Sequence, residues 1–223
     1  MTEYEVLGLP FKDFPLKEAV EYYRELMKQP GIHLASMLSF DEIVQIVENP
    51  QCREWFDSFE FVINQSFDNE DSSRAKSSEK AQDLLDTILR SIMASGEGVF
   101  LLCDTAEHLE LLKFILARYS TLAENDFEIV GEAVYDRVKK DTIYNSINVE
   151  CPKIILSTMN FDMQGHVMME GNKILNASLW LGLIPSALEN IKKGHKIWHM
   201  GIKQQLDIKK RIGRYNKRNK GFV

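Results

Sequence analysis

The chain of 223 residues is 44% hydrophobic and 27% charged, which is typical of a soluble globular protein with one large domain, or with one domain and an appendage. Its apolar runs are too short to cross a bilayer, and its N-terminus carries acidic residues and no signal-peptide pattern, so we expect a cytoplasmic protein. The formal net charge is −6, and three widely spaced cysteines form neither a disulfide framework nor a metal site.

The first part of the chain alternates short apolar strands with amphipathic helices. The pattern predicts strands at residues 4–9, 32–37 and 59–63, and helices at residues 15–28, 40–48 and 51–56. Ser39 is the predicted N-cap of the second helix, which breaks at Asn49-Pro50. Residues 66–80 are polar and rich in serine, and they predict a surface loop near the strand ends before a helix over residues 79–95.

The central stretch, residues 99–103, is five apolar residues in a row and predicts a buried parallel strand. A helix over residues 106–119 and a strand over residues 127–131 complete a strand–helix–strand unit. Such units bind ligands beyond the carboxyl ends of their strands, where Asp104 follows directly. The flanking strands are therefore expected to deliver functional side chains at the same edge: Ser36, Gln65, Asp68 and Asn160.

The remaining elements are a helix over residues 136–149 and strands over residues 153–157 and 175–183. This order predicts an α/β fold with a mostly parallel, Rossmann-like sheet flanked by helices over residues 1–183. Pro185 opens a basic helical appendage over residues 184–223.

The appendage is basic while the body of the chain is acidic. Residues 186–223 hold eleven Lys or Arg against two carboxylates, a local charge of +9, which leaves −15 on the rest. Apolar side chains and Trp198 are interleaved with these cations, which favours a helix that lies along an anionic membrane surface over a merely solvated basic helix.

Motifs with a known chemistry are largely missing. The chain has no GxxxxGKS phosphate loop, no GxGxxG fingerprint and no serine in a nucleophile elbow. His195 and His199 are four residues apart but have no third ligand near in sequence, so no metal or other cofactor is expected. Asn160 follows a strand, where helix capping explains it as well as ligand binding does.

The order of elements and several local phrases resemble the WecG/TagA/CpsF glycosyltransferases over nearly the whole chain, mainly at scaffold positions. The matching phrases are residues 4–10 with Glu18-Ala19-Val20, Asn49-Pro50 with Arg53, residues 59–63, 99–102, 129–131 and 147–156, Trp180-Leu181-Gly182, and the basic tail with Arg211 and Arg214.

The resemblance implies a cytoplasmic enzyme that is peripheral at the inner face of the cell membrane. It implies transfer of a hexosamine-type sugar from a UDP-sugar to a polyprenyl-diphosphate-linked acceptor during cell-wall or capsular polysaccharide assembly. It also implies a metal-independent inverting displacement, with an aspartate as base and C-terminal arginines on the diphosphate. Those roles fit the chemistry, because a base removes the acceptor proton and cations stabilise phosphate charge.

The chain departs from the family at its polar motifs. The family's Thr-Pro-Asn falls on Met37-Leu38-Ser39, its Pro-Asp-Gly with the base on Asn64-Gln65-Ser66, and its glycine pair on Cys103-Asp104. Its Pro-Lys-Gln-Glu falls on residues 161–164, and its late glycine-rich turn on residues 183–186. An amide such as Gln65 cannot act as a base at neutral pH.

Two interpretations follow. In the first, the chain is a divergent glycosyltransferase with Asp68 or Asp104 as base. Its substrate-binding residues are then Ser39, Gln65, Asn160 and Gln164, and its diphosphate- or membrane-binding residues are Lys209, Lys210, Arg211, Arg214, Arg218 and Trp198. In the second, it is a catalytically inactive homologue that serves as a membrane-associated partner or regulator. A nucleic-acid-binding role lacks a supporting aromatic and basic sheet surface, so no nucleic-acid partner is expected.

Overall fold

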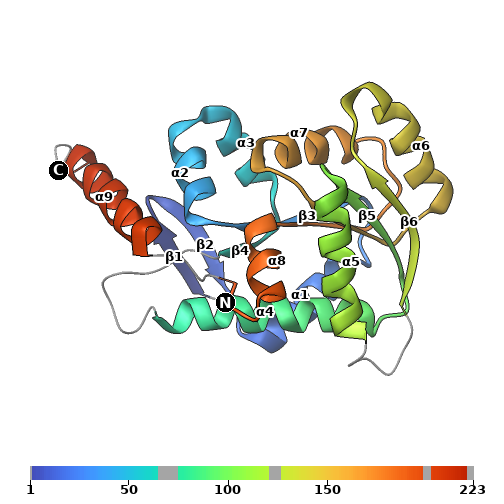
Figure 1. Cartoon of the computed structure of the whole chain (residues 1–223), viewed down its shortest axis with the longest axis horizontal. Helices are drawn as coiled ribbons and strands as arrows, with labels where there is room; N and C mark the ends of the chain where they lie inside the picture. Colours follow the sequence, from blue (N-terminus) through green and yellow to red (C-terminus); the bar gives the residue numbers. More distant parts are fainter. Residues whose placement is uncertain (1, 65–74, 121–126, 198–201, 220–223) are drawn as a thin grey trace.

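The computed structural model describes residues 2–64, 75–120, 127–197 and 202–219, and it has a parallel sheet at its centre (Figure 1). The strands of this sheet are β3 (His33–Leu38), β4 (Phe61–Asn64), β5 (Gly98–Cys103), β6 (Glu128–Val134), β7 (Ile154–Thr158) and β8 (Leu179–Leu183). In the described part of the chain, these six strands run parallel in the order β4-β3-β8-β7-β5-β6. The predicted α/β class is confirmed, and the central strand β5 lies in the interior.

Helices cover both faces of the sheet (Figure 1). One face carries α1 (Leu16–Leu26), α4 (Ala75–Met93), α5 (Ala106–Ser120) and α8 (Pro185–Lys192). The other carries α2 (Phe40–Glu48), α3 (Pro50–Ser58), α6 (Lys140–Glu150) after the 3-10 turn η1 (Arg137–Lys139), and α7 (Phe161–Gly171). The last helix, α9 (Ile202–Asn219), lies beside α2 at one end of the molecule.

The apolar run of β5 explains why both faces are covered. Val99, Leu101 and Cys103 pack in the core cluster beneath α4 and α5, whereas Phe100 and Leu102 pack beneath α6 and α7. Successive side chains of a strand point to opposite faces, so a run that is apolar throughout needs a helical layer on each side. All five side chains are at most 1% exposed.

The N-terminal segment differs from the prediction. Residues 4–9 were expected to form one strand, but the structure has an antiparallel hairpin of β1 (Thr2–Val6) and β2 (Leu9–Asp13), separate from the main sheet. The reason is the two-residue turn at Leu7 and Gly8, whose φ angles of 51° and 76° match the tight turn that hairpins favour. Phe11 of the hairpin packs against Phe56 of α3, with ring centroids 5.4 Å apart.

Several predicted boundaries were also wrong. Helix α4 begins at Ala75, so residues 75–80 are helical and do not belong to the expected polar loop, because alanine, lysine and glutamate are good helix formers even in a polar segment. Strand β6 extends to Val134, and β8 begins only at Leu179. The core also continues past residue 183, since Ala187, Leu188 and Ile197 are fully buried in the cluster beneath α5.

A buried polar network crosses the sheet beneath its carboxyl edge. Trp180 Nε1 donates to Ser157 Oγ at 2.9 Å, and that hydroxyl donates to Gln164 Oε1 at 3.2 Å. Gln164 Nε2 in turn donates to Ser36 Oγ at 3.5 Å. Gly182 of β8 leaves the space that the amide occupies, because a Cβ built there would lie 1.9 Å from Gln164 Nε2. The network therefore joins β3, β7, β8 and α7 in the core.

We predict that Gly182→Ala lowers the free energy of unfolding by about 1–3 kcal/mol, since the added methyl group must displace a buried, hydrogen-bonded amide. Urea unfolding at pH 7 measures this loss. Gly213→Ala on α9 is the control, because no atom lies within 4 Å of the added Cβ. Equal stability of the two variants would contradict this account of the network.

Candidate functional site

The candidate site lies where β5 and β7 end side by side. From β5 the chain leaves through α5 on one face and reaches β6, whereas from β7 it leaves through α7 on the other face and reaches β8 in the opposite direction. Two adjacent parallel strands whose connections diverge in this way form a topological switch point, and open α/β sheets bind ligands beyond it. Asp104 and Asn160 are the polar residues that follow these two strands.

Asp104 joins the two diverging loops. Its Oδ2 accepts hydrogen bonds from the backbone N of Asn160 at 3.0 Å and from Asn160 Nδ2 at 3.1 Å, and its Oδ1 contacts Nδ1 of His108 on the first turn of α5. The Asp104 side chain is only 3% exposed. The structure thus brings together Asp104 and Asn160, both of which the sequence pointed to, and occupies both carboxylate oxygens.

His108 is a site residue that sequence reasoning missed. Its backbone N donates to Thr105 Oγ1 at 3.1 Å, which caps α5 and fixes the first turn. The four-residue spacing from Asp104, across a capped helix start, was the signal that could have found it. A carboxylate that accepts the Nδ1–H bond orients the ring and leaves Nε2 with a lone pair, which is an arrangement suited to taking up a proton.

After β3, Ser39 and Glu42 cap the start of helix α2. Ser39 Oγ accepts from the backbone N of Glu42 at 3.3 Å, and Glu42 Oε2 accepts from the backbone N of Ser39 at 2.6 Å, so the predicted N-cap is a full capping box. Burial raises the pKa of Glu42 to about 7, against the lowering effect of the hydrogen bonds with Ser39. Glu42 is a second titratable group at this edge that the sequence did not single out.

The other predicted site residues do not join this cluster at the surface. Ser36 and Gln164 are buried in the network described above, at 1% and 4% exposure. Gln65, Asp68 and Trp198 lie outside the described residues. Within the described ranges no group of three or more His, Cys, Asp or Glu side chains is arranged to hold a metal ion.

Helix α9 packs on the N-terminal half of α2. Ile208 is 4% exposed and contacts Phe40 and Val44, and Tyr215 Oη donates to the Leu7 carbonyl at 2.7 Å. Arg211 pairs with Asp41 on the first turn of α2. Residues 208, 211, 212 and 215 repeat with helical spacing, so this face of α9 is a packing surface.

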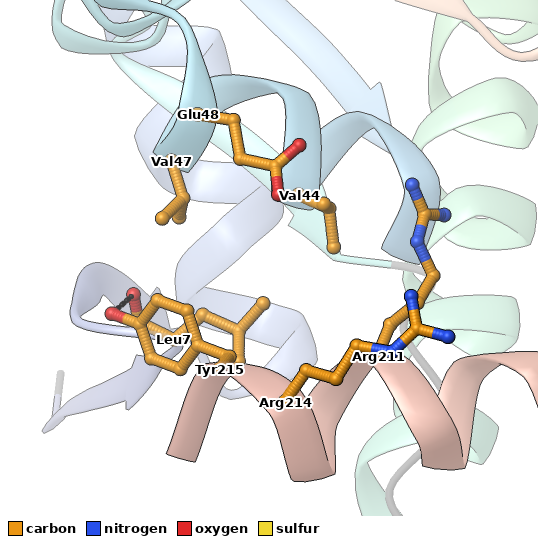
Figure 2. A pocket seen from close by; sticks show the side chains of 7 residues that line it. All are labelled: Leu7, Val44, Val47, Glu48, Arg211, Arg214 and Tyr215. Carbon is orange, nitrogen blue, oxygen red and sulfur yellow. Dashed lines mark hydrogen bonds between the residues drawn. The ribbon is translucent and has the colours of Figure 1, made fainter. Parts of the chain in front are cut away.

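A cavity of about 270 Å³ lies between α9, α2 and the turn of the hairpin. Leu7 of the hairpin turn and Val44, Val47 and Glu48 of α2 line one part of its wall, and Arg211, Arg214 and Tyr215 of α9 line the rest. Figure 2 shows Tyr215 and Leu7 together at one end, while both arginine side chains reach from α9 toward the other. An apolar wall beside two guanidinium groups suits a ligand with an anionic head and an apolar chain.

The prediction that the apolar side chains of the appendage lie against a membrane surface was wrong in part. Ile197 and Ile208 are buried in the protein and are therefore not available to a membrane. Away from the cavity, α9 exposes Leu206 and the cations Lys203, Lys209, Lys210 and Lys217, and Arg214 is exposed beside the cavity. The side chain of Arg218 is not among those described. No helix of the described segments has the length and apolar character needed to span a bilayer.

Comparison with known proteins finds no protein family whose sequence pattern matches the chain and no curated protein that matches it.

We predict that Glu42→Gln removes a pH dependence of stability. Because the folded pKa of about 7 lies above the ordinary value, the contribution of Glu42 is fully present below about pH 4.5 and is lost as the pH rises through 7. Glutamine keeps the capping box, so it serves as a neutral substitute. Urea unfolding of both proteins between pH 5 and pH 8 measures the difference. The wild type is expected to lose stability relative to the variant over this interval, and parallel curves would contradict the prediction.

Proposed function

We propose that the chain is a divergent glycosyltransferase of the WecG/TagA/CpsF type. It transfers a sugar of hexosamine type from a UDP-sugar to a polyprenyl-diphosphate-linked acceptor in cell-wall or capsular polysaccharide assembly. The observation that supports this most directly is the cavity beneath α9, because its two arginines and its apolar wall match the two halves of a polyprenyl diphosphate.

The charged side chains around the cavity determine which contacts a bound diphosphate makes. Arg214 is exposed, whereas Arg211 is paired with Asp41, and Glu48 also lines the cavity. A diphosphate therefore takes the place of Asp41 at Arg211, and its charge is shared by both guanidinium groups. Arginine suits this exchange because its planar fork can bind phosphate oxygens in pairs.

The nucleotide sugar occupies the switch point between β5 and β7. The cavity adjoins the helix that follows β3, and β3 is separated from β5 by β8 and β7. Three strand spacings separate β3 from β5 by about 15 Å, so the acceptor held beneath α9 must extend along the sheet toward the donor. Donor and acceptor thus meet along the same edge, and no cofactor is required for the displacement.

Binding of the two substrates can be measured separately. We predict that UDP-GlcNAc, or another member of a UDP-sugar panel, raises the melting temperature, since a ligand that binds only the folded state stabilises it. Farnesyl diphosphate is the soluble probe for the cavity. Arg211→Ala and Arg214→Ala are each expected to weaken its binding about tenfold, the loss of one charge-assisted interaction of about 1.4 kcal/mol.

Lys217→Ala is the matched control for these variants, because it removes an exposed cation from the same helix outside the cavity. Equal losses in Lys217→Ala and in the arginine variants would contradict a specific diphosphate site. Binding of farnesyl diphosphate without any response to the UDP-sugar panel would favour the second interpretation, an inactive homologue that acts as a membrane-associated partner.

The proposed location is the cytoplasmic face of the membrane, reached through the outer side of α9. Its packing face is occupied by α2, so the contact is made by exposed cations and not by an inserted apolar stripe. Basic residues near an anionic membrane surface contribute about 1 kcal/mol each, and the attraction decays within a Debye length.

We predict that replacing Lys209, Lys210 and Lys217 by glutamine weakens binding to phosphatidylserine-containing vesicles by up to about 100-fold. Salt at about 0.5 M is expected to abolish binding, because it shortens the Debye length and screens the attraction. Vesicle sedimentation measures both effects. The control replaces three exposed lysines elsewhere: Lys17, Lys28 and Lys173. The same loss in both triple variants, or no loss in either, would contradict the assignment of α9 as the contact surface.

A further inference from the structure

We propose that His108 is the proton acceptor of the candidate site and that Asp104 is its positioning residue. The inference rests on the proposed function and names the group that activates the acceptor hydroxyl. The base is then an imidazole on the first turn of α5, whereas the first interpretation of the sequence assigned that role to Asp68 or Asp104.

The environment of Asp104 argues against a direct role in proton transfer. Its side chain is 3% exposed, and its two oxygens together accept from three donors: His108 Nδ1, the backbone N of Asn160 and Asn160 Nδ2. A carboxylate that is enclosed and already accepts at both oxygens is poorly placed to reach a substrate hydroxyl. It is instead well placed to hold an imidazole in one orientation and to stabilise the cation that forms on it.

The environment of His108 fits the role that Asp104 cannot take. The side chain is 21% exposed, so the ring is partly accessible while its Nδ1 contacts Asp104. Nδ1 faces the carboxylate, and within the described residues no atom is hydrogen-bonded to Nε2. Because an ionised carboxylate only accepts hydrogen bonds, the neutral ring carries its proton on Nδ1 and presents the lone pair of Nε2 outward.

The position of the ring is fixed by the fold. Thr105 caps α5, and the Asp104–Asn160 hydrogen bonds tie the start of α5 to the start of α7. His108 therefore sits beside the switch point, where the nucleotide sugar is proposed to bind. Glu42, the other titratable group identified at this edge, has its Oε2 engaged with Ser39 in the capping box.

The step balances without any further reactant. As the acceptor hydroxyl oxygen bonds to the anomeric carbon, its proton passes to His108 Nε2, and the bond from that carbon to the diphosphate oxygen breaks with its electron pair leaving on UDP. The resulting imidazolium is stabilised by Asp104 and later returns its proton to water.

The first test does not depend on activity. In the full chain labelled with ¹⁵N-histidine, long-range ¹H–¹⁵N spectra at pH 8 report which ring nitrogen carries the proton, and comparison with His108→Gln assigns the His108 signals. We expect the proton of the neutral ring on Nδ1. A proton on Nε2 would overturn the proposal, because that nitrogen could then accept nothing.

The second test uses release of UDP from the donor sugar that gives the largest rise in melting temperature, with a polyprenyl-diphosphate acceptor. His108→Gln is expected to lower kcat by about 10²–10⁴-fold while KM for the donor changes little, and imidazole in solution is expected to restore part of the rate to His108→Ala. His166→Gln, which alters an exposed histidine on α7, is the control.

Full activity of His108→Gln would overturn the proposal, as would an unchanged kcat with a raised KM. A wild type that binds no UDP-sugar and transfers no sugar would refute the proposed function instead. In that case the tautomer still decides whether His108 is arranged as a proton acceptor, so the two failures remain distinguishable.

Discussion

The structure of the candidate site depends on one carboxylate. Asp104 follows the central strand β5, and through its bonds to Asn160 and His108 it holds the starts of α5 and α7, which leave the sheet on opposite faces. Because the chain leaves β5 and β7 on opposite faces, a switch point forms between these strands, and Asp104 fixes the relative position of the two helix starts beside it. Without this carboxylate three groups lose their acceptor: His108 Nδ1, the backbone N of Asn160 and Asn160 Nδ2.

The C-terminal helix shows how a basic segment can have two different sides. Ile208, Ile212 and Arg211 are used against α2 and Arg214 lines the cavity, while Lys203, Lys209, Lys210 and Lys217 are exposed. The packing side creates the cavity with the arginines, and the outer side creates a charged surface. If both proposals hold, the same helix positions the protein at the membrane and holds the diphosphate of the lipid that the membrane supplies.

Much of the fold could be predicted from the sequence, whereas the site could be predicted only in outline. The uninterrupted apolar run of residues 99–103 is sufficient to indicate an interior parallel strand, and Ser39 before an acidic first turn indicates a helix N-cap. The hairpin was missed because the turn at Leu7-Gly8 needs a positive φ from a leucine, which residue preferences do not suggest. The relation of Asp104 to Asn160, 56 positions apart, depends on strand order, and the burial of Ile208 depends on how α9 docks. Neither is contained in a local pattern.

The proposed binding of a nucleotide at the edge between β5 and β7 can be tested directly by titrating the ¹⁵N-labelled full chain with UDP and following the backbone amide signals. We expect the largest shifts to cluster at residues 104–108 and 159–164, at the starts of α5 and α7. Shifts that cluster only on another part of the surface would contradict nucleotide binding at this edge. The absence of shifts at about 1 mM UDP, a concentration at which even weak binding is detected, would contradict it as well.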